Sequence, residues 1–199
     1  NPIFMQRTQG VGYLALDRLL ALGVTGPMIR AAGLGWDIRK AEPYSSYEKF
    51  DFRIPVQQAG DVYARFRVRM DEMRESAKIV EQCLAGMPEG PIRAEAPKVV
   101  LPDREKMKTQ MEALIYHFKI VTEGFQVPAG EAYVPVESPR GELGFYVVSD
   151  GTAKPARVFM RTPSYGNLQA LGELFHGKLI ADSIATLGSM DFVLGDVDR

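Results

Sequence analysis

Residues 60 to 86 read GDVYARFRVRMDEMRESAKIVEQCLAG, a stretch whose hydrophobic residues follow a helical period. Apolar side chains recur there at steps of three or four and therefore share one stripe of a helix: Val62, Phe66, Met70, Met73, Ala77, Val80 and Leu84. Charged side chains fall off that stripe: Arg65, Arg69, Glu72, Glu75 and Lys78. Asp61 is suited to cap the start and Gly86 to end the last turn. The pattern predicts one long helix that packs through its apolar stripe.

A second amphipathic helix is predicted after Pro102, with Asp103 as its cap and Gly124 at its end. Its apolar stripe consists of Met107, Met111, Leu114, Phe118 and Val121. Proline and glycine at positions 88, 90 and 91 interrupt the helical pattern between the two helices. Stripes of similar length then favour an antiparallel helix pair with methionines in its core. Cys83, which borders the first stripe, is expected to be a small buried residue.

The first 56 residues are predicted to be compact but irregular, because glycines repeatedly separate short apolar runs. Asp17 to Leu22 is a candidate for one helical turn, and the alternation from Lys49 to Val56 predicts a strand. Gly10-Val11-Gly12 resembles the start of a dinucleotide-binding loop. It lacks the third glycine and the strand–turn–helix context, which argues against a nucleotide site.

Residues 130–162 predict a small antiparallel sheet with two turns. Its three strands are expected at Glu131 to Val136, Leu143 to Ser149 and Ala156 to Arg161. Between the first two strands, Pro139 fixes the backbone before Arg140, and Gly141 permits a sharp turn after it. We therefore expect the guanidinium of Arg140 to be held at a defined place. Two short helices, at residues 167–174 with Ser164 as a cap and at residues 179–187, follow the sheet.

The tail at residues 189–199 combines acids with apolar residues. Asp191, Asp196 and Asp198 face one cation, Arg199, and acids this close repel one another unless cations match them. The neighbouring apolar residues favour a tail that binds the fold: Phe192, Val193 and Leu194. We therefore expect arginines from earlier in the chain to hold the tail. The candidates are Arg140 and Arg161.

Composition restricts the class of protein. The chain has 199 residues, 46% of them hydrophobic and 25% charged, which is ordinary for a soluble globular protein. A net charge of -1 does not indicate binding to nucleic acid or to an anionic membrane surface. Apolar runs are far shorter than the roughly 20 residues that cross a bilayer. Cys83 is the single cysteine, which excludes an internal disulfide and an all-cysteine metal site. The first residue, Asn1, suggests a piece of a longer polypeptide.

Several motifs together resemble one family. They are Glu137 to Gly144, Ser149 to Gly151, Arg161 to Ser164 and Gly195 to Arg199, with Arg69 to Ser76, Tyr116 to Phe118, Thr122 to Phe125 and Asn1 to Phe4. This combination spans the chain and is similar to the 49 kDa subunit of respiratory complex I, the bacterial NADH-quinone oxidoreductase. Members of that family are longer, and the chain resembles their C-terminal half.

The family is related to the large subunit of nickel-iron hydrogenases, and this kinship implies a fold. We expect residues 1–199 to form part of a hydrogenase-large-subunit-like α+β fold, mainly helical. The expected parts are an irregular α+β segment at residues 1–56, the helix pair at residues 57–125, and the sheet with the C-terminal helices and tail at residues 126–199.

The hydrogenase ligand pattern is Asp-Pro-Cys, two residues, Cys, two residues, and then His or Arg. On that pattern Asp191 matches the Asp, Val193 and Asp196 take the two cysteine places, and Arg199 takes the last place. Valine has no donor atom, and a carboxylate is a hard ligand unlike the thiolates of a nickel-iron centre. The resemblance therefore implies that no metal is bound here. Arg140 matches the arginine that overhangs the hydrogenase metal, so the resemblance also brings it to the tail.

The resemblance implies that the vacated space is part of a quinone cavity, at the contact with the subunit that carries the terminal iron-sulfur cluster. The expected cavity-lining residues are Arg140, Val193, Gly195, Asp196 and Arg199. The chain is then a cavity wall and docking scaffold in a proton-pumping complex that oxidises NADH and reduces quinone. It binds no cofactor of its own. Other complex I subunits hold it, as a peripheral protein, at the cytoplasmic face of the inner membrane.

The family's quinone-binding tyrosine and histidine belong to its N-terminal half. Tyr44 and His117 therefore do not take those roles, no catalytic residue is expected in this chain, and the isolated piece is expected to be inactive. Tyr44 and Tyr47 are half-buried anchors or part of a functional surface, and His117 is a hydrogen-bonded structural residue. Two alternatives stay open: a metal-containing large subunit of a membrane-bound hydrogenase, and a non-catalytic interaction domain that keeps the ancestral fold.

Overall fold

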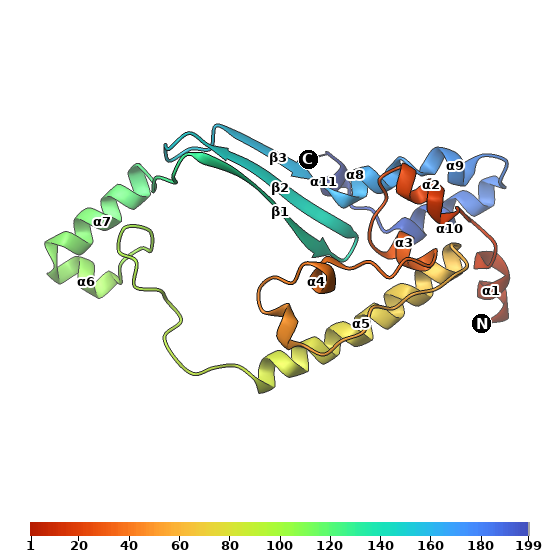
Figure 1. Ribbon diagram of the computed structural model, residues 1–199, viewed down its shortest axis with the longest axis horizontal. Helices are drawn as coiled ribbons and strands as arrows, with labels where there is room; N and C mark the ends of the chain where they lie inside the picture. The colour runs from red at the N-terminus through yellow and green to blue at the C-terminus, as the bar shows by residue number, and fades with distance from the viewer. Residues whose placement is uncertain (199) are drawn as a thin grey trace. The chain divides into compact units, whose positions relative to one another are not determined.

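The computed structural model describes residues 1–198, which form an α+β structure of helices and one three-stranded sheet (Figure 1). The chain divides into two compact units. The first contains residues 1–86, residues 134–144 and the chain from residue 160 onward, and the second contains residues 87–133 and 145–159. The α+β class predicted from the sequence is confirmed. The hydrogenase-like fold and the three-part division of the sequence stay predictions.

Short helices open the first unit. They are α1 (Pro2–Thr8), α2 (Leu16–Ala21), α3 (Pro27–Ala31), α4 (Ile38–Ala41) and the 3-10 helix η1 (Tyr47–Lys49). Polar side chains cap two of them, because Asn1 accepts a hydrogen bond from the amide of Ile3, and Asp37 accepts one from the amide of Arg39. The helical turn predicted at residues 17–22 is confirmed as α2.

The long helix α5 (Val62–Ala85) is confirmed, including its cap, where the Asp61 carboxylate accepts from the amide of Ala64. The predicted packing face is wrong for most of the apolar stripe. Helices α1, α3 and α10 contact α5, which buries Val62 of the stripe but also Ala64, Val68, Arg65 at 1% exposed and Glu75 at 6% exposed. Residues of the apolar stripe are exposed instead: Phe66, Met73, Val80 and Leu84. Cys83 is also exposed, and its predicted burial is wrong.

The strand predicted from Lys49 to Val56 is wrong as well. This segment runs irregularly along α5, whose side chains take its backbone amides. The amide of Asp51 donates to Gln82 Oε1 over 2.8 Å, and the amide of Arg53 donates to Glu75 Oε2 over 3.0 Å. These side-chain acceptors replace the second strand that an alternating sequence would otherwise need.

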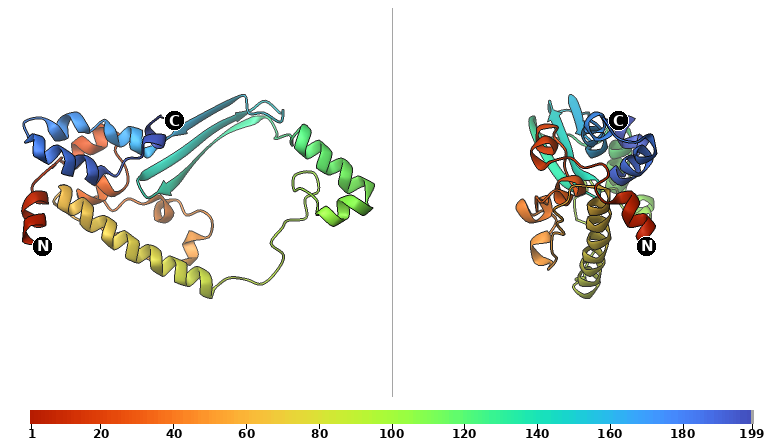
Figure 2. Two further views of the ribbon diagram at one scale, coloured as in Figure 1. Left: turned by 180° about the vertical axis from the view of Figure 1, so that it is seen from behind. Right: turned by 90° about the vertical axis from the view of Figure 1, so that its right-hand side faces the viewer.

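The C-terminal helices of the first unit are α8 (Pro163–Leu168), α9 (Leu171–Phe175), α10 (Ile180–Met190) and α11 (Leu194–Asp198). The sequence predicts α10 and, as one helix, α8 with α9. It does not predict α11. Because α1 and α10 are in contact, segments near the two ends of the described chain lie side by side (Figure 2).

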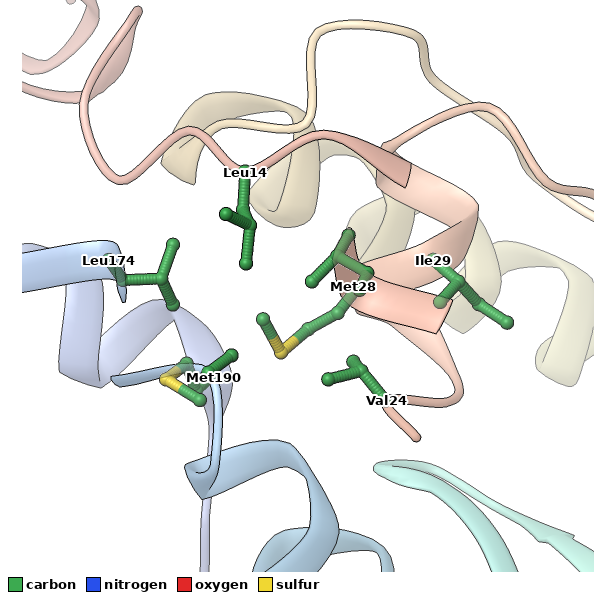
Figure 3. Close-up of a cluster of buried hydrophobic side chains, with 8 residues drawn as sticks. Leu14, Val24, Met28, Ile29, Leu174 and Met190 are labelled. Atoms are coloured by element: carbon green, nitrogen blue, oxygen red, sulfur yellow. The ribbon is translucent and has the colours of Figure 1, made fainter. Parts of the chain in front are cut away.

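The core of the first unit joins α2 and α3 to α9 and α10. Its buried residues are Leu14, Leu19, Val24, Met28, Ile29, Ala170, Leu174 and Met190. Figure 3 shows Leu14, Met28, Leu174 and Met190 converging from the N-terminal and C-terminal segments. The core therefore fixes the end of α10, from which the tail begins, against residues from the start of the chain.

The second unit contains α6 (Arg104–Thr109) and α7 (Met111–Thr122). The sequence predicts one helix here. The chain is extended at Gln110, with φ -124° and ψ 119°, so the helix is interrupted. Of the predicted stripe, Met111, Leu114, Phe118 and Val121 are exposed. The antiparallel pairing of the two predicted helices stays a prediction, because α5 and α7 belong to different units.

The sheet has the order β1 (Gly130–Ser138), β2 (Gly141–Ser149) and β3 (Arg157–Arg161). The three predicted strands are thus confirmed, with longer bounds for the first two. The turn that joins β1 to β2 belongs to the first unit and carries Arg140. Within residues 1–198, no helix combines the length and apolar character that crossing a bilayer requires.

Candidate functional site

Arg140 contacts the start of the tail. Its Nε donates to the main-chain oxygen of Asp191 over 2.6 Å, and its Nη2 lies 3.6 Å from Asp191 Oδ1. Asp191 follows the last residue of α10 in a left-handed conformation, with φ 53° and ψ 46°. This conformation turns the chain out of the helix and presents the Asp191 oxygen to the turn between β1 and β2. The predicted contact of Arg140 with the tail is confirmed, whereas its place in a cavity stays a prediction.

Arg69 binds the same helix end from α5. Its Nη1 donates to the oxygen of Ser189 over 2.6 Å, its Nη2 donates to the oxygen of Met190 over 3.1 Å, and its Nε lies 4.0 Å from Asp191 Oδ2. The last carbonyl groups of a helix have no partners within the helix and carry partial negative charge. Burial lowers the pKa of Arg69, and the nearby guanidinium groups of Arg140 and Arg30 lower it further, against the attraction of Asp191.

Arg65 lies one turn earlier on α5 and binds three neutral oxygens. It donates to Ser189 Oγ over 2.9 Å, to the oxygen of Gly60 over 3.0 Å and to the oxygen of Gly12 over 3.0 Å. Burial, together with the neighbouring charge of Arg69, lowers the pKa of Arg65 to about 10. A side chain built on Gly12 would lie 2.9 Å from this guanidinium, so glycine leaves room for it.

Arg65 and Arg69 are not predicted as site residues from the sequence, where they fall on the side of the helix away from the apolar stripe. The sequence nevertheless contains a signal for a buried charged face. Arg65, Arg69, Glu72 and Glu75 follow the same steps of three and four as the apolar residues. A charged stripe of that period marks a buried face when it meets polar groups that satisfy it.

Asp196 binds a main-chain amide rather than an arginine. Its Oδ2 accepts from the amide of Ser164 over 2.9 Å, in the first turn of α8. The N-cap residue of α8, Thr162, makes no capping bond with its own side chain. Asp196 therefore caps α8 from the tail, and the cap predicted for Ser164 is not formed by that residue.

The second cation expected to hold the tail, Arg161, is used elsewhere. It donates to the main-chain oxygens of Glu142 over 3.2 Å and of Gly23 over 3.3 Å, and it lies 3.3 Å from the Glu142 carboxylate. These contacts join β3, β2 and the loop before α3. The prediction that Arg161 holds the tail is wrong.

The rest of the tail is only partly covered. Phe192 is half-buried, but Val193 is 42% exposed and Leu194 is 75% exposed, so the expected burial of these apolar residues is wrong for two of the three. Gly195 lies within α11, and Arg199 lies outside the described residues. Among residues 1–198, no three histidine, cysteine or acidic side chains are grouped so that they would hold a metal ion.

A buried charge cluster fixes the base of the turn that carries Arg140. Arg30 is 2% exposed, and it lies 2.6 Å from the carboxylate of Glu72 on α5 and 2.8 Å from that of Glu137 on β1. Burial raises the pKa of both carboxyl groups although Arg30 opposes the shift. Burial would lower the pKa of Arg30, but the two carboxylates raise it overall. One cation thus ties α3 to two acids from distant segments.

The backbone of the turn is held by close contacts. Gly26 has φ +74°, and a side chain there would lie 2.5 Å from the Cα of Gly141 and 2.7 Å from the oxygen of Arg140. Asn167 donates to that Arg140 oxygen over 3.0 Å and accepts from the amide of Thr25 over 3.1 Å. The main chain of Arg140 is therefore fixed before its side chain reaches Asp191.

Three residues considered from the sequence lie outside this arrangement. Tyr44 is half-buried, and its hydroxyl accepts from the amide of Glu137 over 3.0 Å, which supports its role as an anchor. Tyr47 stacks edge-on against Tyr44. His117, on α7 in the second unit, has a buried Nδ1 without a hydrogen-bond partner among residues 1–198, so the expected hydrogen bond is not found there.

Comparison with known proteins identifies the family. The model of the respiratory-chain NADH dehydrogenase 49 kDa subunit matches residues 1–199. The chain is 66% identical to an NADH-quinone oxidoreductase subunit of Solibacter usitatus (strain Ellin6076), over all of the chain and 49% of that protein. It is 63% identical to the corresponding subunit of Koribacter versatilis (strain Ellin345), over all of the chain and 50% of that protein.

Other similar proteins share a lower identity with the chain. The identity to the NADH-quinone oxidoreductase subunit of Acidothermus cellulolyticus is 52% over 215 aligned residues, which cover all of the chain and 49% of that protein. The chain thus spans about half the length of the curated relatives it matches. Because the family model matches its whole length, the chain belongs to the family of the 49 kDa subunit of respiratory-chain NADH dehydrogenase.

Proposed function

We propose that the chain is part of the quinone-reducing subunit of a proton-pumping NADH:quinone oxidoreductase. In this role it forms one wall of the quinone cavity and a docking scaffold for the subunit that carries the terminal iron-sulfur cluster. The relatives, which are named as subunits of NADH-quinone oxidoreductase, support this function. The isolated chain is inactive, because the electrons come from the partner's cluster.

One observation carries the proposal: Arg140 binds Asp191 at the start of the tail. The two residues lie 51 positions apart in the sequence, and a turn with a tightly packed backbone presents the guanidinium. Such a fixed cation beside a partly exposed apolar tail suits a wall that contacts a quinone ring. The proposed lining residues are Arg140, Val193, Gly195, Asp196 and Arg199, the last of which lies outside the described residues.

The ligand chemistry of the tail disfavours the alternative, a nickel-iron hydrogenase subunit. Val193 offers no donor atom at one of the two cysteine positions. Asp196 has its carboxylate engaged with the amide of Ser164 at the other. We propose that the chain holds no metal or cofactor of its own, and that quinone is a substrate of the whole complex. Other subunits attach it to the cytoplasmic face of the inner membrane.

The proposal is tested by Arg140→Ala in the full-length subunit within the assembled complex. We expect a loss of NADH:quinone reductase activity, while NADH oxidation by an artificial acceptor such as ferricyanide stays unchanged. Removing one partner of an ion pair also destabilises a fold, by about 3–5 kcal/mol when the pair is buried, so the amount of assembled complex is measured in the same preparation. Arg157→Ala is the matched control, since Arg157 is an exposed arginine on β3 of the same sheet.

Unchanged quinone turnover in the assembled Arg140→Ala complex would overturn the proposal that the chain forms a wall of the quinone cavity. Elemental analysis of the purified complex distinguishes the quinone-reducing subunit from the alternative, a nickel-iron hydrogenase subunit. Stoichiometric nickel would support the hydrogenase subunit, and iron without nickel supports the quinone-reducing one. If a complex without this subunit still forms and reduces quinone, the result would support the remaining alternative, a non-catalytic interaction domain.

A further inference from the structure

Three guanidinium groups surround the C-terminal end of α10. Arg65 binds Ser189 through its hydroxyl, Arg69 binds the oxygens of Ser189 and Met190, and Arg140 binds the oxygen of Asp191. Two of the arginines come from α5 and the third from the turn between β1 and β2. The final turn of α10 and the first residue of the tail are thus bound from two sides.

Burial makes the charges at this helix end costly. Burial lowers the pKa of Arg69 although Asp191 and Glu72 oppose the shift, and it lowers the pKa of Arg65 although Asp61 opposes it. The helix C-terminus adds a partial negative charge of about half an elementary charge, and its carbonyl groups could bind water instead if they were exposed. The bonds that the arginines make with the backbone offset the cost of burying them.

Among the three, Arg69 makes the contacts that decide where α10 ends. Its two Nη atoms bind consecutive main-chain oxygens, and its Nε, which has no hydrogen-bond partner among residues 1–198, lies 4.0 Å from the Asp191 carboxylate. The bonds satisfy carbonyl groups that would otherwise accept from a further helical turn. The chain then leaves the helix through the left-handed Asp191, whose oxygen meets Arg140.

We propose that Arg69 is a positioning residue for the quinone site: it ends α10 at Met190 and thereby holds Asp191, and the tail that follows, against Arg140. The proposal rests on the proposed function, since it takes the tail as part of the quinone cavity. Arg69 itself touches no substrate. It acts through the backbone of residues 189–191, so its loss shifts Val193 and Asp196 together.

The geometry requires an arginine. A guanidinium presents several N–H donors in a rigid plane and reaches two neighbouring oxygens at once, whereas the ammonium of lysine is a compact charge without that fork. Lysine would keep the charge beside Asp191 and lose one of the two backbone bonds. Charge and positioning are therefore separable by substitution.

The test uses Arg69→Met and Arg69→Lys in the full-length subunit within the assembled complex. We expect kcat/KM for a short-chain quinone, per assembled complex, to fall by about tenfold to a hundredfold in Arg69→Met, the scale of a misplacement near 1 Å. Arg69→Lys should recover only part of this loss. A higher KM with unchanged electron entry from NADH to ferricyanide distinguishes positioning from a general loss of stability, which lowers only the amount of complex.

Arg74→Met is the matched control, because Arg74 lies on the same helix, is largely exposed and pairs with Asp71. It should leave kcat/KM for quinone unchanged. If Arg69→Met prevents assembly, Arg69→Lys decides the question, and wild-type kcat/KM in that variant overturns the proposal. If Arg140→Ala lowers quinone turnover and neither Arg69 variant does, the positioning role of Arg69 is overturned, but the proposal that the chain forms a wall of the quinone cavity stands. When none of these variants affects turnover, the proposed function fails as well.

Discussion

Arg140 binds Asp191 through the main-chain oxygen over 2.6 Å, and only more loosely through the carboxylate at 3.6 Å. The closer bond depends on the left-handed turn at Asp191 and not on its side chain. Most residues other than glycine, asparagine and aspartate resist that conformation, at a cost of roughly 1–2 kcal/mol. The backbone of Asp191, more than its charge, therefore connects the tail to the sheet.

Substitution of Asp191 by glycine and by alanine separates these two contributions. Both variants lose the carboxylate, but Asp191→Gly adopts the left-handed turn readily. We expect Asp191→Gly to unfold at a higher urea concentration than Asp191→Ala, with a difference of about 1 kcal/mol in the free energy of unfolding. Equal stability of the two variants would show that the turn is not under strain.

The close contact between Gly26 and Gly141 predicts a large effect of one methyl group. In Gly26→Ala the new Cβ would lie 2.5 Å from the Cα of Gly141, so the turn that carries Arg140 must shift. We expect a loss of about 2–4 kcal/mol in the free energy of unfolding, from the left-handed backbone together with overpacking. Gly23→Ala is the control, because Gly23 has φ +69° with open space around it, and it should lose only about 1 kcal/mol. Similar losses in both variants would contradict the contact.

Arg30 should be indispensable for the stability of the first unit. Arg30→Met leaves the carboxylates of Glu72 and Glu137 buried without their shared cation, and we expect a loss of about 3–5 kcal/mol in the free energy of unfolding. Adding Glu137→Gln to Arg30→Met should restore part of the lost free energy of unfolding. A double-mutant cycle measures the restored part.

The loss of stability caused by Arg30→Met should also depend on pH. Burial raises the pKa of Glu72 and of Glu137. A raised pKa in the folded state favours folding at low pH, where the group is protonated, and this advantage disappears as pH rises through the folded-state pKa. The deficit of Arg30→Met should therefore shrink as the pH is lowered from neutral toward 4.5, the ordinary pKa of a glutamate. A deficit that is constant with pH would show that the carboxylates are not its cause.

Asp196 should contribute as a helix cap rather than as an ion-pair partner. Asp196→Asn keeps an oxygen acceptor for the amide of Ser164, whereas Asp196→Ala leaves that amide without it. We expect Asp196→Ala to lose about 1 kcal/mol in the free energy of unfolding and Asp196→Asn to lose much less. Hydrogen exchange at the amide of Ser164 provides a local measurement, since only the alanine variant should accelerate it.

The contact of Arg140 with the tail could be predicted from the sequence, because Pro139 and Gly141 define the turn and an acidic tail favours a nearby cation. The main-chain oxygen of Asp191 as the closer partner could not be predicted, because it depends on the left-handed turn at the end of α10. The helix of residues 62–85 was predictable from its period alone, but its packing face was not. Two stripes of the same period lie on this helix, one apolar and one charged. The choice between them depends on distant polar groups, such as the oxygens of Gly12 and Ser189, that the sequence does not bring together.

The wrong prediction of a strand from Lys49 to Val56 has the same cause, namely polar partners that are distant in the sequence. Alternation predicts a pleated segment only where another backbone supplies the hydrogen bonds. Here Gln82 and Glu75 supply them from side chains of α5. Asp196 is a third case, because its partner is a main-chain amide at the start of α8, which no charge pattern indicates.

The bonds of Arg65 have a consequence for the order in which the protein folds. One buried guanidinium joins Gly12 and Ser189, which lie 53 and 124 positions away from it. During translation, the residues near position 65 leave the ribosome long before residue 189 exists, so this cation has no complete set of acceptors in the nascent chain. Contacts between such distant positions slow folding. The first unit is therefore expected to mature after synthesis, during a period in which chaperones have access to it.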